Sequence, residues 1–185
     1  MALNALMVLI TLGAIVLWVT VRYKALISLR NQVENGWKRI DVQLKRRHDL
    51  IPKLVDTVQD IMEFEQETLE TVISARSAAI SARGVADSAA KEGCLTDELS
   101  RFFVVAEQYP QLRSSENVRR LQEELTVSEN KIVFACRFYN DIATEFNIAQ
   151  QAFPASIIAA SFRFQLAELF EIPAAAEREV PAVSP

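Results

Sequence analysis

The pattern of hydrophobic and polar positions changes abruptly after the first two dozen residues. Residues 2–21 carry no charge, and polar side chains interrupt them only at Asn4, Thr11 and Thr20. At about 1.5 Å of rise per residue, such a helix is roughly 30 Å long, which matches the hydrocarbon core of a bilayer. The pattern predicts one transmembrane anchor over residues 1–23, held in the lipid bilayer through residues 2–21.

The alternative for this segment is a cleaved secretory signal peptide. A signal peptide has a basic start, a shorter apolar core and a cleavage site made of small residues. Here no Lys or Arg precedes the apolar run, which passes directly into Arg22. Trp18 and Tyr23 lie near its downstream end, where amphipathic rings suit the membrane–water interface. These features favour a retained anchor.

Basic residues are distributed unequally about the anchor. None precedes it, whereas Arg22, Lys24 and Arg30 follow it closely. The positive-inside rule then places the short N-terminus outside and the domain in the cytoplasm. We expect a single-pass protein of the cell membrane. Cys94 and Cys136 are far apart and in no metal or redox spacing, which agrees with reduced thiols.

Three seams of apolar residues, spaced alternately three and four apart, predict long packed helices. The clearest runs for about five heptads from Val118 to Phe153 and predicts a helix that starts near Ser115. A second seam covers residues 26–44 and continues the anchor helix. A third covers residues 54–80, although Glu65 and Arg76 occupy two of its positions.

The breaks between these seams set the predicted topology. The segment His48-Asp-Leu-Ile-Pro52 predicts a sharp reversal, because Pro is tolerated in the first turn of a helix and Asp49 can cap that turn. Residues 84–93 (GVADSAAKEG) predict the main loop, and a shorter helix follows over residues 95–108.

The predicted fold is all-α, a single N-terminal transmembrane helix followed by an elongated antiparallel bundle of about four helices. The bundle is expected over residues 24–172. Residues 173–185 (PAAAEREVPAVSP) have the composition of a disordered tail. The apolar segment before this tail is expected to dock, either on the end of the bundle or on the membrane surface.

Candidate chemistry is sparse. Di-iron bundles use pairs of Glu-x-x-His motifs, but His48 is the chain's one histidine. The sequence has no Gly-rich phosphate loop and no G-x-S-x-G elbow. We therefore expect no catalytic residue, cofactor or metal site. The net charge of −4 also argues against nucleic acid as a partner.

The cluster Lys45, Arg46, Arg47 and His48 is the candidate partner-binding site. On the predicted topology it lies in the turn at the membrane-distal tip, where Arg can offer bidentate donors to carboxylates of a partner protein. Two alternatives remain. Asp41 and Asp49 could pair with these cations and hold the tip together, or the cluster could be a solvated helix end.

Several segments between Gln32 and Phe170 resemble the LemA family of single-span bacterial proteins, and they follow one another in the order expected for that family. They are residues 35–55 (NGWKRIDVQLKRRHDLIPKLV), 106–113 (AEQYPQLR), 121–125 (LQEEL), 128–132 (SENKI), Arg137-Phe-Tyr-Asn140, Phe146-Asn147 and Phe153-Pro154. Ser115, Ser128 and Phe146 depart from the residues usual in that family.

The resemblance implies a membrane-anchored helical bundle with a short external N-terminus and no established catalytic activity. Three functions follow as hypotheses. The first is a scaffold that presents the bundle to other membrane or cytoplasmic proteins. The second is a laterally assembling, homo-oligomeric protein that organises a membrane region, such as an organelle or a microdomain. An enzyme is the least favoured.

Overall fold

The computed structural model describes residues 2–63 and 65–171, which form six helices and no strand. The helices are α1 (Ala2–Val58), α2 (Gln66–Ile80), α3 (Val85–Ala106), α4 (Pro110–Ser114), α5 (Glu116–Gln151) and α6 (Ala155–Ser161). The predicted all-α class is confirmed. The tail predicted from residue 173 onward lies outside the described residues.

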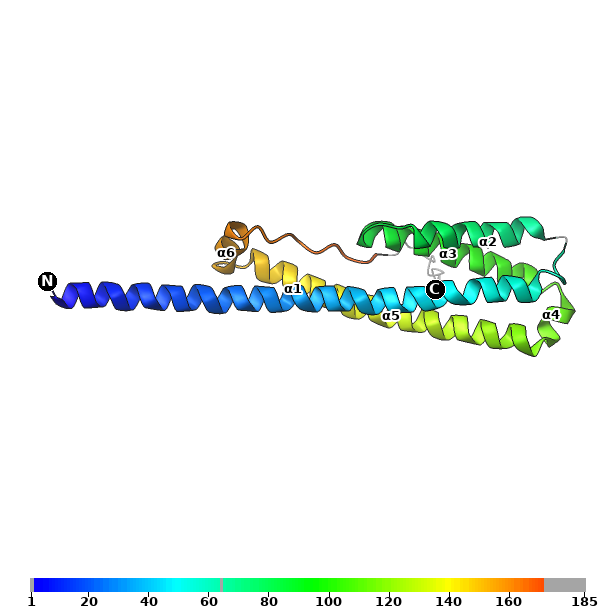
Figure 1. The fold of residues 1–185 in the computed structure, drawn as a ribbon, viewed down its shortest axis with the longest axis horizontal. Coiled ribbons are helices and arrows are strands. Elements are labelled where there is room, and N and C mark those ends of the chain that lie inside the picture. Colours follow the sequence, from blue (N-terminus) through cyan, green and yellow to red (C-terminus); the bar gives the residue numbers. More distant parts are fainter. Residues whose placement is uncertain (1, 64, 172–185) are drawn as a thin grey trace, which may run out of the picture.

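The helices build a rod (Figure 1). α1 runs along almost its whole length, α2 returns, α3 runs outward again, and α5 returns beside α1. Four antiparallel helices therefore make up the half farther from the N-terminus. In the nearer half, α5 accompanies α1 without α2 and α3, and α6 lies beside α1 at the near end of α5.

Each half has its own buried core. The far core gathers apolar side chains of all four bundle helices, among them Ile51, Leu54, Val72, Leu95 and Phe102. The near core lies mainly between α1 and α5 and includes Val33, Ile40, Ile132, Tyr139 and Phe146. Burial of these side chains is the main source of stability for a helical rod of this kind.

The seam predicted for the last long helix is confirmed over nearly its whole length. Ser115 caps α5 by accepting a hydrogen bond from the Val118 amide at 3.5 Å. Val118, Ile132 and Phe146 are buried as the spacing predicts. Phe153 is the exception, because α5 ends at Gln151 and the side chain is 82% exposed.

The reversal predicted at residues 48–52 is wrong. α1 continues through Pro52 to Val58, and the chain turns after this helix instead, from residue 59 onward. The third seam therefore belongs to two helices, with Leu54 on α1 and Leu69 on α2. Pro52 does not end the helix, because the Arg76 side chain donates a hydrogen bond to the His48 carbonyl, which Pro52 cannot bond.

The main loop predicted at residues 84–93 is also wrong. Only Gly84 stands outside a helix there, with a positive φ of 81° that glycine adopts without strain, and α3 starts at Val85. Ala, Lys and Glu in this segment are strong helix formers, and Asp87 suits the first turn of a helix. Gly93 is buried inside α3.

The apolar segment at the N-terminus is an unbroken part of α1. Leu3, Leu9 and Ile15 are 71%, 69% and 60% exposed, so the bundle does not cover them. Among the described helices, α1 is the one that is long and apolar enough to cross a membrane. The candidate anchor and the first bundle helix are therefore a single element.

Candidate functional site

A cluster of polar and charged side chains is buried between α1 and α3. His48 Nε2 lies 2.6 Å from Glu92 Oε1, and Arg47 Nη1 lies 3.5 Å from Glu92 Oε2. Arg47 also donates a hydrogen bond to the Thr96 hydroxyl at 2.9 Å. Arg47, His48 and Glu92 are 4%, 8% and 1% exposed. We call these four residues the buried ion-pair cluster.

The structure divides the predicted partner-binding residues into two pairs. Arg47 and His48 point into the bundle, next to the buried Leu44 and Ile51 on the same face of α1. Lys45 and Arg46 are exposed. All four lie within α1 and not in a turn, so the predicted position at the distal tip is wrong.

The alternative pairing with Asp41 and Asp49 is wrong for the two buried side chains, Arg47 and His48. Both aspartates are exposed on α1, whereas Arg47 and His48 pair with Glu92 of α3. Glu92 was not among the predicted residues, because residues 84–93 were interpreted as a loop. A helical spacing through Ala89, Glu92, Leu95 and Leu99 is the signal that could have placed Glu92 on a buried face.

Arg76 of α2 explains why α1 passes through Pro52. Proline has no amide hydrogen, so the carbonyl four residues earlier, that of His48, lacks its normal helical donor. Arg76 Nε donates a hydrogen bond to this oxygen at 2.7 Å. Arg76, one of the two charged residues in the third seam, thus supplies the hydrogen bond that α1 lacks at Pro52.

Burial shapes the electrostatics around this cluster. It lowers the pKa of Arg47, while the nearby carboxylates of Glu92 and then Glu129 act in the opposite direction. Burial, followed by the charge of Glu92, raises the pKa of Cys136 on α5 to about 12. Among the described residues, Glu92 Oε2 has no hydrogen-bond partner, so its compensation is the ion pair with Arg47.

A groove of about 490 Å³ adjoins the cluster, and His48 forms part of its wall with Trp37, Asp41, Lys45 and Ser88. No group of three His, Cys, Asp or Glu side chains suited to a metal ion occurs in the described part of the chain. The arrangement joins α3 to α1 by the Arg47–Glu92 ion pair and the His48–Glu92 hydrogen bond.

A second polar arrangement lies on α5, where two asparagines hold an extended segment of backbone. Asn147 accepts from the Ala167 amide at 2.8 Å and donates to the Ala167 carbonyl at 2.9 Å. Asn140 makes the same pair of bonds with Phe170, at 2.8 and 3.1 Å. We call the held segment, residues 164–171, the C-terminal strap.

The spacing of these contacts follows from helix geometry. Seven residues of α-helix rise about 10.5 Å, and three residues of extended chain cover about 9–10 Å. Asn147 and Asn140, seven residues apart on α5, can therefore bind Ala167 and Phe170, which are three residues apart on the C-terminal strap. The Tyr139 hydroxyl adds a hydrogen bond of 2.8 Å to the Glu168 carbonyl, and Phe170 is buried against Trp37. The buried Tyr139 thus directs its hydroxyl to a backbone carbonyl.

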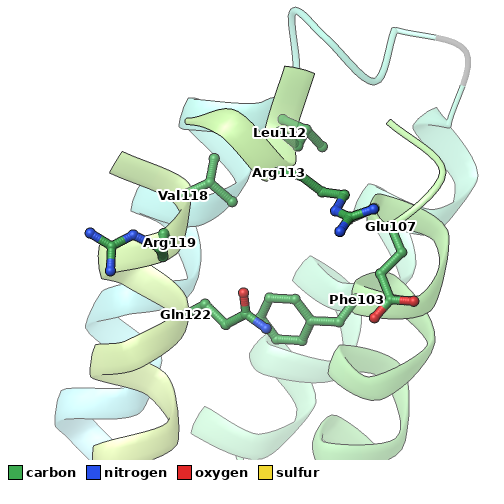
Figure 2. Close-up of a pocket in the computed structure, with 8 residues that line it drawn as sticks. Phe103, Glu107, Leu112, Arg113, Val118, Arg119 and Gln122 are labelled. Carbon is green, nitrogen blue, oxygen red and sulfur yellow. The ribbon is translucent and has the colours of Figure 1, made fainter. Parts of the chain in front are cut away.

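A hollow of about 290 Å³ opens at the far end of the rod, between α3, α4 and the start of α5 (Figure 2). Phe103, Leu112 and Val118 supply apolar surface, and Glu107 and Arg113 lie at its edge. Nearby, the Tyr109 hydroxyl donates to Glu65 at 3.1 Å and ties this end to the α1–α2 turn. The tip is therefore built from residues other than the predicted basic cluster.

Comparisons with known proteins agree with this architecture. The family model described as "LemA family" matches residues 36–184. The chain is also 28% identical over 130 residues to a protein named "Protein LemA" from Metamycoplasma hominis. That alignment covers 68% of this chain and 58% of the relative. The family match extends over the bundle, including the buried ion-pair cluster and the C-terminal strap, and the chain belongs to the LemA family.

Proposed function

We propose that this protein is a membrane-anchored, non-catalytic scaffold that holds a helical rod in the cytoplasm for protein partners. One observation carries the proposal. The apolar segment and the first bundle helix form a single unbroken helix, α1, whose first part is exposed and whose second part lies in the bundle core. A continuous helix transmits the orientation of the anchor directly to the domain.

The charge distribution supports the cytoplasmic orientation. The first twenty-one residues contain no Lys or Arg, whereas Arg22, Lys24 and Arg30 follow within a short distance. These residues are on α1 itself, so there is no loop that could carry them away from the membrane surface.

A reporter enzyme fused after Pro185 tests the orientation. A phosphatase that is active only outside the cytoplasm should stay silent there, while a fluorescent protein that matures in the cytoplasm should give signal at the same position. Strong phosphatase activity would overturn the proposed orientation.

Lys45 and Arg46 are the proposed contacts for acidic groups of a partner. Both are exposed, and they lie about 24 residues beyond the apolar segment, roughly 36 Å along a helix. This distance exceeds the Debye length at physiological ionic strength, so lipid headgroups are not their natural partners on a straight rod.

Charge removal at this position tests the scaffold. In Lys45→Gln/Arg46→Gln, partner proteins crosslinked to the wild-type chain should be lost while the melting temperature stays unchanged. Arg119→Gln/Arg120→Gln is the matched control, since it removes two exposed cations near the far end of the rod. Equal partner capture by both variants and the wild type would contradict the proposed contact.

A second candidate function, lateral self-assembly, is favoured by one feature of α5. Val127, Phe134 and Phe138 are 46%, 69% and 44% exposed and occur at helical spacings of seven and four. Such a stripe of apolar side chains is suited to packing against a second copy. Mass photometry of the detergent-solubilised protein, compared with Phe134→Gln, distinguishes a homo-oligomer from a monomeric scaffold.

A further inference from the structure

The corner between α5 and α6 exposes large apolar side chains that the bundle does not use. Phe153, Ile157 and Phe162 are 82%, 60% and 55% exposed. They lie at both ends and on the outer side of the seven-residue helix α6. This corner is at the end of the rod where α1 leaves the bundle, as Figure 1 shows.

The inner side of α6 determines how close this corner lies to the anchor. Ile158 and Ala159 are buried together with Leu26 of α1, and Trp18, Val19 and Tyr23 pack against the same group. The rings of Phe162 and Tyr23 are 4.6 Å apart. α6 therefore contacts α1 at the last residues of the apolar segment.

Helix geometry then fixes the depth of the corner, given the proposed function in which residues 2–21 span the bilayer. Trp18 lies three residues before the end of that segment, about 4.5 Å along the helix axis. Side chains that touch Trp18 and Val19 are thus at the boundary between acyl chains and headgroups. Exposed Phe and Ile at this depth are stabilised by leaving water.

The charges nearby are of one sign. No acidic residue occurs between Asn147 and Ala167, and none occurs before Glu34. The exposed Arg163, together with Arg22 and Lys24 on α1, offers cations to phosphate groups at the same level.

We propose that α6 and its flanking turns, residues 152–163, form a second membrane contact, which inserts Phe153 and Ile157 into the interface of an anionic phospholipid bilayer. The contact lies beside the anchor and not in line with it. Two contacts side by side restrict the tilt of the rod, which a single spanning helix leaves free.

Lipid quenching of a fluorophore tests this proposal on the full chain in phospholipid nanodiscs that contain anionic lipid. The environment-sensitive probe NBD is attached to Ile157→Cys or Phe153→Cys in a Cys94→Ser background, and the background without an added cysteine gives the residual labelling of buried Cys136. Both sites are exposed, so neither change disturbs the core. The expected result is blue-shifted emission and loss of fluorescence with lipids that carry a doxyl group near the headgroup.

Two matched sites complete the experiment. Phe134→Cys is at an exposed aromatic position on α5, about 19 residues before Phe153 and thus roughly 29 Å along the rod. It should show no quenching by lipid. Leu9→Cys lies within the anchor and should be quenched most by doxyl groups deep in the acyl chains.

The outcomes separate this inference from the proposed function. If Leu9→Cys is quenched and Ile157→Cys behaves like Phe134→Cys, the second contact is wrong and the anchor stands. If Leu9→Cys is not quenched, the anchor itself is wrong. Blue-shifted but unquenched emission at Ile157→Cys that rises with the number of chains per nanodisc would assign the surface to a second copy and overturn the proposal.

Discussion

Pro52 shows how a single missing amide hydrogen is accommodated in the interior of a helix. The carbonyl of His48 would be left without a donor, at a cost of about 1–3 kcal/mol for a buried polar group. The guanidinium of Arg76 replaces that donor from a neighbouring helix at 2.7 Å. The residue that usually ends a helix thus creates a specific contact between α1 and α2.

A double-mutant cycle tests this pairing. Arg76→Met should destabilise the protein by about 1.5–3 kcal/mol, because a charge-assisted hydrogen bond is lost. In a Pro52→Ala background the alanine amide can bond to the His48 carbonyl, so the same Arg76→Met change should cost much less. Equal costs in both backgrounds, measured by chemical denaturation of the full chain in detergent, would refute the role of Arg76.

The buried ion-pair cluster predicts an asymmetric response to mutation. Glu92→Gln leaves the buried Arg47 without its counter-charge and should cost about 3–5 kcal/mol. The double variant Arg47→Met/Glu92→Met should be more stable than Glu92→Gln, since no unpaired charge remains. Glu98→Gln, on the same helix but in a surface ion pair, should change the melting temperature little.

Cys136 links stability to alkaline pH. The folded protein holds the thiol proton up to a pKa of about 12, whereas the unfolded chain releases it near 9.0. Between these values the unfolded state binds fewer protons, so stability should fall as pH rises, and below about pH 9 there should be no effect. The difference in denaturation midpoint between wild type and Cys136→Ala should therefore change with pH only in this alkaline window.

At the scale of helices, sequence periodicity predicted α5 and the continuity of α1 with the apolar N-terminal segment, because an apolar seam marks each helix and Ser115 caps α5. Periodicity gave wrong predictions where a contact with a residue far away in the sequence outweighed the local preference of the chain. Pro52 predicted the end of a helix, but the hydrogen bond from Arg76 allows α1 to continue. The partner of Arg47, Glu92, lies on α3, in a segment between two glycines that was predicted to be a loop. Tertiary contacts of this kind are absent from any local window of sequence.

The position of the C-terminal strap could not be predicted from local sequence patterns, for a different reason. Asn140 and Asn147 bind its backbone and not its side chains, so nothing in residues 164–171 identifies the residues that hold it. The residues that indicate this contact are on α5. They are the half-buried side chains of Asn140 and Asn147, seven residues apart and next to the seam residues Tyr139 and Phe146.

The asparagine contacts yield a prediction for this segment. Asn140→Ala/Asn147→Ala removes four hydrogen bonds to the C-terminal strap, so its amides at Ala167 and Phe170 should exchange with solvent much faster while α5 remains protected. Hydrogen–deuterium exchange with peptide resolution measures this. Asn130→Ala, at an exposed position of α5, is the control, and unchanged exchange in the double variant would contradict the assignment.

At the scale of the whole molecule, the two halves of the rod are stabilised in different ways. The far half is a four-helix bundle with an ion-pair cluster between its layers. The near half has two long helices, and the C-terminal strap and α6 cover the side that α2 and α3 leave open (Figure 1). The part of the bundle nearest the exposed apolar segment is thus covered by segments that follow α5 in sequence.

The unbroken α1 also fixes an angle. Since 3.6 residues complete a turn, each residue added to a helix rotates everything beyond it by about 100°. Each side of the exposed apolar segment, which is the proposed anchor, is therefore fixed in angle relative to the side of the bundle that carries Lys45 and Arg46. A single-residue insertion before Trp18, ahead of the contacts with α6, would leave the packing of the bundle intact and still turn the bundle to face another direction.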